Sequence, residues 1–245
     1  MKVALVTGAS RGLGAEIAKF LAKDQWQVAV NYAHDQNGAE AVVGAIRAAG
    51  GEALAINFDV TDAEAVAAGI ARVAAELGPI DLVVNNATGP QANFAIDDQT
   101  WDHYQRHFEF FVKAPLLSLQ ALLPQWRARG TGRVINIGSE VVSVGNARNA
   151  DYVSAKAAMV GLTRSWASEL GPEGITVNLV APGWIPVERH EGTSDEVYAR
   201  HTKSVPLGRM GKPSDIAAMV AFIASPAADY ITGQTISVNG GRTFS

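Results

Sequence analysis

The fold of this chain is decided by the stretch Val3-Ala4-Leu5-Val6-Thr7-Gly8-Ala9-Ser10-Arg11-Gly12-Leu13-Gly14, in which a short apolar run leads into a glycine-rich loop. Beyond the loop, Leu13, Ile17 and Leu21 recur at helical spacing. Glycines let a pyrophosphate approach the backbone without a Cβ in the way, and the helix start presents free N–H groups to the anion. The stretch predicts a strand, a phosphate-binding loop and a helix; a tight turn without a ligand is the alternative.

The rest of the chain continues this alternation of apolar runs and helical patterns. The other runs are rich in β-branched residues and nearly continuous, as in strands that are buried on both faces of a parallel sheet. They cover residues 28–30, 53–58, 82–84, 134–137, 176–180 and 235–238. Helices are expected over residues 62–77 and 152–170, each followed by Gly-Pro. We therefore predict a doubly wound α/β fold with one domain over residues 1–245.

Composition and charge narrow the class of protein. The 245 residues are 48% hydrophobic and 18% charged, which is typical of a globular chain with one sizeable core. A formal net charge of -4 gives no indication of a nucleic-acid or membrane partner. The lack of cysteine excludes disulfides, thiolate metal sites and a cysteine nucleophile. No segment is typical of a signal peptide or reaches the ~20 apolar residues of a membrane span, so we expect a cytoplasmic protein.

The adenosine end of a dinucleotide site is expected after the second apolar run. A carboxylate there would bind a ribose 2′-hydroxyl and repel a 2′-phosphate. The residues from Asn31 to His34 contain none, and the first carboxylate is Asp35. Arg11, in the glycine loop, could meet a 2′-phosphate or be an ordinary solvated charge. This pattern favours NADP over NAD. Asp59-Val60, after the third run, could hold the adenine or form a turn.

A serine, a tyrosine and a lysine predict the chemistry. Tyr152 and Lys156 are four apart at the start of a helical pattern, so they project from one face about a turn apart. Ser139 follows a strand at its carboxyl end, where α/β sheets bind ligands. Hydride transfer to a ketone leaves an alkoxide that Tyr152 can protonate, and a nearby ammonium brings a tyrosine pKa of about 10 towards neutrality. Ser139 would polarise the carbonyl, and Lys156 could also hold the nicotinamide ribose.

Together these motifs carry a resemblance to a known family. The chain resembles the short-chain dehydrogenases/reductases nearly end to end, and looks most like the 3-oxoacyl-carrier-protein reductase subgroup. The motifs are Thr7-Gly8-x-x-x-Gly12-x-Gly14, Asp59-Val60, Asn85-Asn86-Ala87, Ser139, Tyr152-x-x-x-Lys156, Pro182-Gly183 and Gly233-Gln234-x-x-x-Val238-Asn239-Gly240-Gly241.

The resemblance implies a Rossmann-type seven-stranded parallel sheet with helices on both faces and a homotetramer or dimer. It implies Ser139, Tyr152 and Lys156 as the catalytic residues of an enzyme that transfers a hydride between a nicotinamide cofactor and a carbonyl or secondary alcohol. With the residue-based arguments, the candidate cofactor-binding residues are Gly8, Ser10, Arg11, Gly12, Leu13, Gly14, Asn31, His34, Asp59, Val60, Asn86, Ala87, Tyr152, Lys156, Pro182, Gly183 and Ile185.

Three positions depart from the family pattern. Thr88 replaces the usual glycine after Asn-Asn-Ala, and Val187 stands where a threonine commonly contacts the nicotinamide amide. The family's fourth catalytic residue is an asparagine thought to hold a water in a proton relay through the lysine, and Phe111 occupies its position. Phe111 cannot hold that water, so the relay must be replaced or weakened. Two alternatives stay open: an NAD-dependent sugar or small-alcohol dehydrogenase, and a cofactor-binding protein with weak turnover.

The helical stretch that contains Phe111 carries two further patterns. His103 and His107 have the spacing of a zinc pair, but the metalloprotease glutamate and a third ligand are missing. We therefore expect a solvated helix face there and no metal. The aromatic residues from Trp101 to Phe111 indicate a core or a subunit interface rather than substrate stacking.

Two other segments could meet partners. Residues 187–210 are irregular and polar, and they fall where the family has its mobile substrate loop, so we expect a lid; a surface loop is the alternative. Trp184, just before them, could wall the substrate pocket or simply pack. Arg127, Arg129 and Arg133 could dock an acidic carrier protein, but a solvated helix end is the preferred interpretation.

Overall fold

The protein, described by a computed structural model, is built on one seven-stranded parallel sheet. The structure describes residues 1–244, apart from the Arg189 side chain. The strand order is β3-β2-β1-β4-β5-β6-β7, and each pair of neighbouring strands in it is parallel. The strands are β1 Val3–Val6, β2 Gln27–Tyr32, β3 Glu52–Asn57, β4 Ile80–Asn85, β5 Gly132–Ile137, β6 Ile175–Pro182 and β7 Thr235–Val238.

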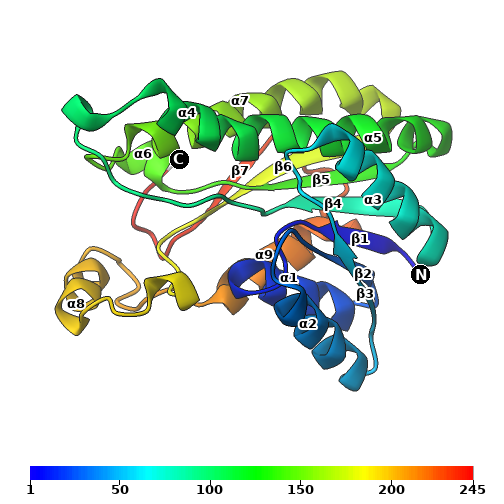
Figure 1. The fold of residues 1–245 in the computed structure, drawn as a ribbon, viewed down its shortest axis with the longest axis horizontal. Helices are drawn as coiled ribbons and strands as arrows, with labels where there is room; N and C mark the ends of the chain where they lie inside the picture. The colour runs from blue at the N-terminus through cyan, green and yellow to red at the C-terminus, as the bar shows by residue number, and fades with distance from the viewer. Residues whose placement is uncertain (245) are drawn as a thin grey trace.

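Helices cover both faces of this sheet (Figure 1). One face carries α1 (Gly12–Lys23), α2 (Gln36–Ala48) and α9 (Pro213–Ala224), and the other carries α3 (Ala63–Glu76), α5 (Ala114–Arg129) and α7 (Ala150–Leu170). The shorter elements are η1 Ile96–Asp98, α4 Trp101–Phe108, the π-helical η2 Glu109–Lys113, α6 Val141–Val144, η3 Gly171–Glu173, η4 Glu188–His190, α8 Asp195–Lys203 and η5 Pro226–Ala228.

The burial of β1 shows why continuous apolar runs predicted this architecture. Ala4 and Val6 pack into the core on the α1 side, whereas Val3 and Leu5 pack into the core on the α3 side. Successive side chains of a strand point to opposite faces, so a strand that is covered on both sides needs apolar residues at every position. The predicted seven-stranded Rossmann-type sheet is confirmed, and each predicted strand end lies within two residues of the observed one.

The order of the strands fixes where a ligand can bind. β1 lies between β2 and β4, so the chain proceeds outward to β3 and then returns to the other side of β1. Crossover helices diverge at such a switch point and leave a crevice at the carboxyl ends of the strands. The glycine loop follows β1 and the Asn85-Asn86-Ala87 motif closes β4, so both motifs meet at this crevice. Within residues 1–244, no helix is long and apolar enough to cross a membrane.

Candidate active site

The loop after β1 has a backbone that only glycine accommodates well. Gly8 and Gly12 have φ angles of +61° and +57°, in the left-handed region that other residues rarely adopt. A Cβ on Gly8 would lie 2.8 Å from the Ala87 Cα, and one on Gly14 would lie 2.5 Å from the Asn86 amide nitrogen. These glycines therefore allow the loop to pack directly against the end of β4, as a dinucleotide cradle requires.

Two asparagines fasten this loop to the sheet. Asn31 is buried; its Oδ1 accepts from Gly8 N at 3.1 Å, while its Nδ2 donates to Phe58 O at 3.0 Å. Asn86 Nδ2 donates to the carbonyls of Thr7 and Gly8 at 2.9 and 3.0 Å. The sequence predicted both asparagines as cofactor contacts, and the structure gives them a role that the sequence did not show. These bonds hold the loop in its observed shape without any ligand.

The residues expected at the adenosine end differ in exposure. Arg11 and His34 are exposed, and Val60 is buried. Asp35 caps α2 through a hydrogen bond from Gly38 N to its Oδ1 at 3.0 Å. Asp59 forms a turn, since its Oδ1 accepts from both the backbone and the hydroxyl of Thr61 at 2.8 Å. Each of these carboxylates is thus engaged in local structure, while the Arg11 guanidinium is open to solvent.

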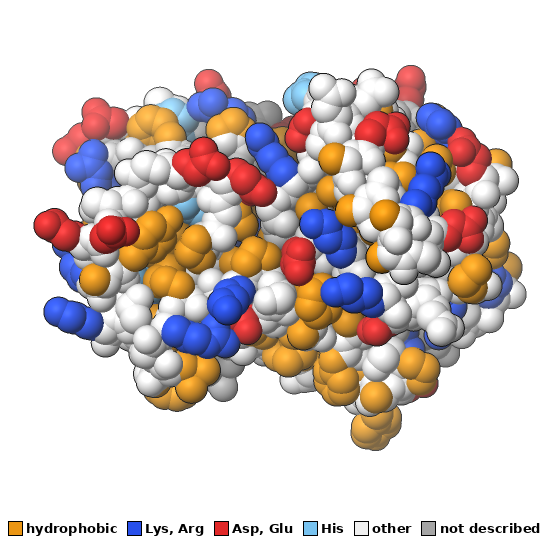
Figure 2. All heavy atoms as spheres, turned by 90° about the horizontal axis from the view of Figure 1, so that it is seen from below, with side chains coloured by type: hydrophobic (Ala, Val, Ile, Leu, Met, Phe, Trp, Pro, Cys, Tyr) orange, Lys and Arg blue, Asp and Glu red, His pale blue; other side chains and the backbone are white. Residues whose placement is uncertain are grey.

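An open groove of about 610 Å³ runs along the outer side of the glycine loop. It is lined by α1, α2 and the segment that contains η4, and Figure 2 shows the molecular surface hollowed between the α8 side and the α1–α2 side. At the groove, Gly12 N donates to Glu188 Oε1 at 3.3 Å. A carboxylate thus occupies the N-terminal end of α1, where N–H groups and the helix dipole favour an anion. The site therefore fits a pyrophosphate group.

The predicted catalytic residues come from the end of β5 and the start of α7. Ser139 is half-buried, and its Oγ accepts from Val141 N at 3.3 Å. Tyr152 and Lys156 lie one turn apart on α7, with 9% and 5% of their surfaces exposed. Lys156 Nζ donates to Ile137 O at 2.6 Å, two residues before Ser139. This bond fixes the ammonium beside the strand end that carries the serine.

Phe111 lies in contact with this pair. The Lys156 Nζ is 3.7 Å from the centroid of the Phe111 ring, a cation–π contact, and that ring meets the Tyr152 ring edge-on at 5.5 Å. Phe111 is 1% exposed and belongs to η2, a π-helical segment. Single π-helical turns within α-helices are frequent at functional sites. An aromatic face therefore stabilises the ammonium at the position where the family has its asparagine.

The burial of His107 differs from our expectation. We expected a solvated helix face, but His107 is buried, and its Nε2 lies 3.5 Å from Asp151 Oδ2. Burial lowers the pKa of His107, while the Asp151 charge opposes this. The prediction was wrong because Asp151, the polar partner that lets His107 be buried, lies on another helix. The sequence around His107 therefore could not show that this partner is present. His103 differs, since its ring stacks on Phe94 at 3.8 Å. Among the described residues, no three metal-ligating side chains gather into one cluster.

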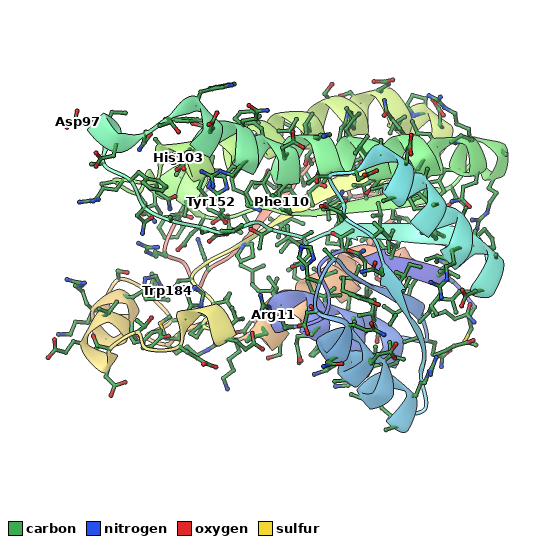
Figure 3. All side chains as sticks on the ribbon, in the orientation of Figure 1. Arg11, Asp97, His103, Phe110, Tyr152 and Trp184 are labelled. Atoms are coloured by element: carbon green, nitrogen blue, oxygen red, sulfur yellow. The ribbon has the colours of Figure 1, made fainter. Side chains whose placement is uncertain are left out.

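Trp184 packs against the segment that we expected to be a lid. Its ring stacks on Tyr198 of α8 at 5.2 Å and meets His201 edge-on at 5.0 Å. In the view of Figure 3, Tyr152 lies on the α7 side of the site and Trp184 on the α8 side. Trp184 therefore anchors α8; whether α8 moves as a lid stays a prediction.

A partly buried ion pair that the sequence did not indicate joins the segment after β5 to the C-terminal segment. Glu140, directly after Ser139, pairs with Arg242 through its Oε1, and both groups act on His201 of α8. Burial first, and then the Arg242 charge, lower the pKa of His201. No local pattern could have revealed this pair, because its members are 102 residues apart.

The predicted arginine cluster is not an open basic patch, and the predicted aromatic core is only partly buried. Each arginine pairs with a carboxylate, so the cluster is largely neutralised rather than an open basic patch; the pairs are Arg127–Glu173, Arg129–Asp81 and Arg133–Asp229. In the aromatic stretch, Phe111 is core as predicted, but Trp101 is 70% exposed. A subunit interface at Trp101 stays a prediction.

Comparisons with known proteins agree with this geometry from end to end. A family model described as enoyl-(acyl carrier protein) reductase matches residues 8–243. The 3-oxoacyl-(acyl-carrier-protein) reductase FabG of Staphylococcus aureus is 45% identical over 242 residues, which are 98% of this chain and 97% of that protein. A putative gluconate dehydrogenase from Agrobacterium tumefaciens has a TM-score of 0.93 and 30% identity, covering 98% and 95% of the two chains. For a doubly substituted Serratia marcescens short-chain dehydrogenase/reductase, the TM-score is 0.90, the identity 37% and the coverage 99% and 98%.

Proposed function

The chain belongs to the short-chain dehydrogenase/reductase family, and from that premise we propose that it is an NADP-preferring carbonyl reductase of the 3-oxoacyl thioester type. Family membership makes it an oxidoreductase that acts on CH–OH groups with a nicotinamide cofactor. The main support for the proposal is the hydrogen bond that Lys156 Nζ donates to Ile137 O. This bond joins α7, which carries Tyr152 and Lys156, to the end of β5, which Ser139 follows.

The chain's own residues divide the reaction between them. A nicotinamide cofactor, when bound, would supply the hydride. The N–H groups at the start of α1 bind the pyrophosphate, and Ser139 Oγ donates a hydrogen bond that polarises the substrate carbonyl. Tyr152 gives its phenolic proton to the alkoxide that hydride transfer leaves on the substrate. The Lys156 ammonium, held by Ile137 O and the Phe111 ring, stabilises the resulting phenolate.

The preference for NADP rests on the charges around the adenosine end. Asp35 and Asp59 are engaged in a helix cap and a turn, and Arg11 is exposed within the glycine loop. A guanidinium there suits a 2′-phosphate. NAD-binding proteins of this fold use a carboxylate at the end of the second strand to bind the ribose, and residues 31–34 contain none. The expected roles of Asn31 and His34 in cofactor binding stay predictions, as do a homotetramer or dimer and a cytoplasmic location.

The substrate class rests on the relatives. FabG of Staphylococcus aureus is named a 3-oxoacyl-(acyl-carrier-protein) reductase, so a 3-oxoacyl thioester is the first substrate to test. The likeness to a putative gluconate dehydrogenase supports a second candidate, NAD-dependent oxidation of a sugar or small alcohol. The three arginine ion pairs leave little open positive charge for an acidic carrier protein, so a thioester of a small thiol should be accepted.

One set of assays tests the proposal. NADPH and NADH oxidation are followed with acetoacetyl thioesters, diketones and quinones, and NAD and NADP reduction with sugars and small alcohols. We expect turnover with NADPH and an acetoacetyl thioester, abolished in Tyr152→Phe while NADPH binding is kept. Near-normal kcat in that variant would exclude Tyr152 as the proton donor. Micromolar NADPH binding without turnover of any substrate would instead show a cofactor-binding protein.

A further inference from the structure

A buried histidine–aspartate pair that the mechanism does not use is in contact with Tyr152. We propose that Asp151, held by His107, is a positioning residue that keeps the Tyr152 phenol protonated at neutral pH and so favours carbonyl reduction over alcohol oxidation. This proposal rests on the proposed function, in which Tyr152 donates the proton.

The geometry joins these groups into one packed unit. Asp151 is 1% exposed; its Oδ1 accepts from Tyr152 N at 2.9 Å, and its Oδ2 lies 3.5 Å from His107 Nε2. The His107 ring meets the Tyr152 ring edge-on at 5.4 Å and stacks on Phe111 at 5.9 Å. The same Phe111 ring lies under the Lys156 ammonium. A change in the charge of His107 or Asp151 therefore acts on Tyr152 and Lys156 through buried contacts.

The sign of the effect follows from the charges that face His107. These are Asp151 and Lys156 on α7, together with Arg106 and His103 on its own helix. Burial is the largest influence and lowers the pKa of His107, so its imidazole is neutral at neutral pH. A neutral imidazole does not offset the carboxylate of Asp151, which accepts a hydrogen bond from Tyr152 N at 2.9 Å. A negative charge disfavours a phenolate, so Asp151 opposes the Lys156 ammonium, which favours one.

Coulomb's law gives the order of magnitude of the effect. In a medium with an effective dielectric constant of about 20, a unit charge at about 10 Å shifts a pKa by about one unit. We therefore expect a shift of about one pH unit when the charge of Asp151 is removed. A purely structural role would lower the rate without moving any titration.

The experiment measures the pH dependence of kcat/KM for carbonyl reduction. The alkaline limb reports the loss of the Tyr152 proton. In Asp151→Asn, which keeps an oxygen to accept from Tyr152 N, this limb should move to lower pH by about one unit. In His107→Gln, which keeps the carboxylate charge, it should not move to lower pH. Glu109→Gln, which removes a partly exposed carboxylate on the neighbouring η2 segment, is the matched control and should leave the limb in place.

A second variant and a binding measurement test the same role of Asp151 where the first experiment fails. If Asp151→Asn does not fold, Asp151→Ser removes the same charge and keeps an acceptor for Tyr152 N. If the wild-type protein turns over no substrate, the proposed function fails, but the pH dependence of NADP⁺ binding still reports the ionisation of Tyr152. Its midpoint should shift to lower pH in the Asp151 variant. A variant that loses activity or affinity with unmoved midpoints would overturn the proposal.

Discussion

Replacing Glu188 by Gln removes the carboxylate that occupies the N-terminal end of α1. In the structure its Oε1 accepts from Gly12 N at 3.3 Å, and its Oε2 lies 3.3 Å from the place of a Cβ on Gly12. A pyrophosphate bound to this helix start must displace the carboxylate. An exposed anion at a helix N-terminus contributes about 0.3–1 kcal/mol, so its removal should tighten NADPH binding about two- to fivefold.

Calorimetric titration of NADPH measures this change directly. Glu191→Gln is the matched control, because Glu191 is exposed in the same segment and lines the same groove. We expect its affinity to equal that of the wild type, and the gain in Glu188→Gln to shrink in high salt, where exposed charges are screened. An affinity for Glu188→Gln that equals or falls below that of Glu191→Gln would refute competition at the helix start.

Three other changes test separate parts of the structure. Arg11→Ala should weaken NADPH more than NADH in the same titration, and equal losses would exclude Arg11 as the reader of the 2′-phosphate. Gly8→Ala should lower the free energy of unfolding by roughly 1–3 kcal/mol in urea titrations, because φ is +61° and the new Cβ would meet the Ala87 Cα; an unchanged midpoint would contradict this. Because burial lowers the pKa of His107, the unfolded chain takes up a proton below about pH 6.5 that the folded chain does not. The free energy of unfolding should therefore decrease from about pH 7 to about pH 5, and His107→Gln should flatten that slope; parallel slopes would argue against a lowered pKa.

The fold was predictable because its signals are local. A continuous apolar run, a glycine loop and a helix stand next to one another between Val3 and Lys23, and parallel sheets repeat this unit. The spacing of Tyr152 and Lys156 placed both on one face of α7 in the same way. Such patterns are read within a window of a few turns, so one sequence suffices to place them.

The contacts that adjust the site were not predictable, because they join residues that are far apart in the chain. His107 and Asp151 meet across two helices, and Glu188 reaches Gly12 over 176 residues. Apolar periodicity shows which face of a helix is buried, but it does not show which polar group pairs with a distant one. The expectation of a solvated His107 failed for this reason.

The π-helical segment Glu109–Lys113 has a consequence for how the site is encoded. An α-helix turns by about 100° per residue, so one inserted residue rotates all that precedes it by that angle relative to α5. His107 lies just before the insertion, and its orientation towards Asp151 depends on this change of phase. Removing one residue other than Phe111 from the segment would restore the α-helical register and turn the imidazole away, although every side chain of the site would still be present. The environment of the tyrosine is thus specified by the length of a helix as much as by the identity of its residues.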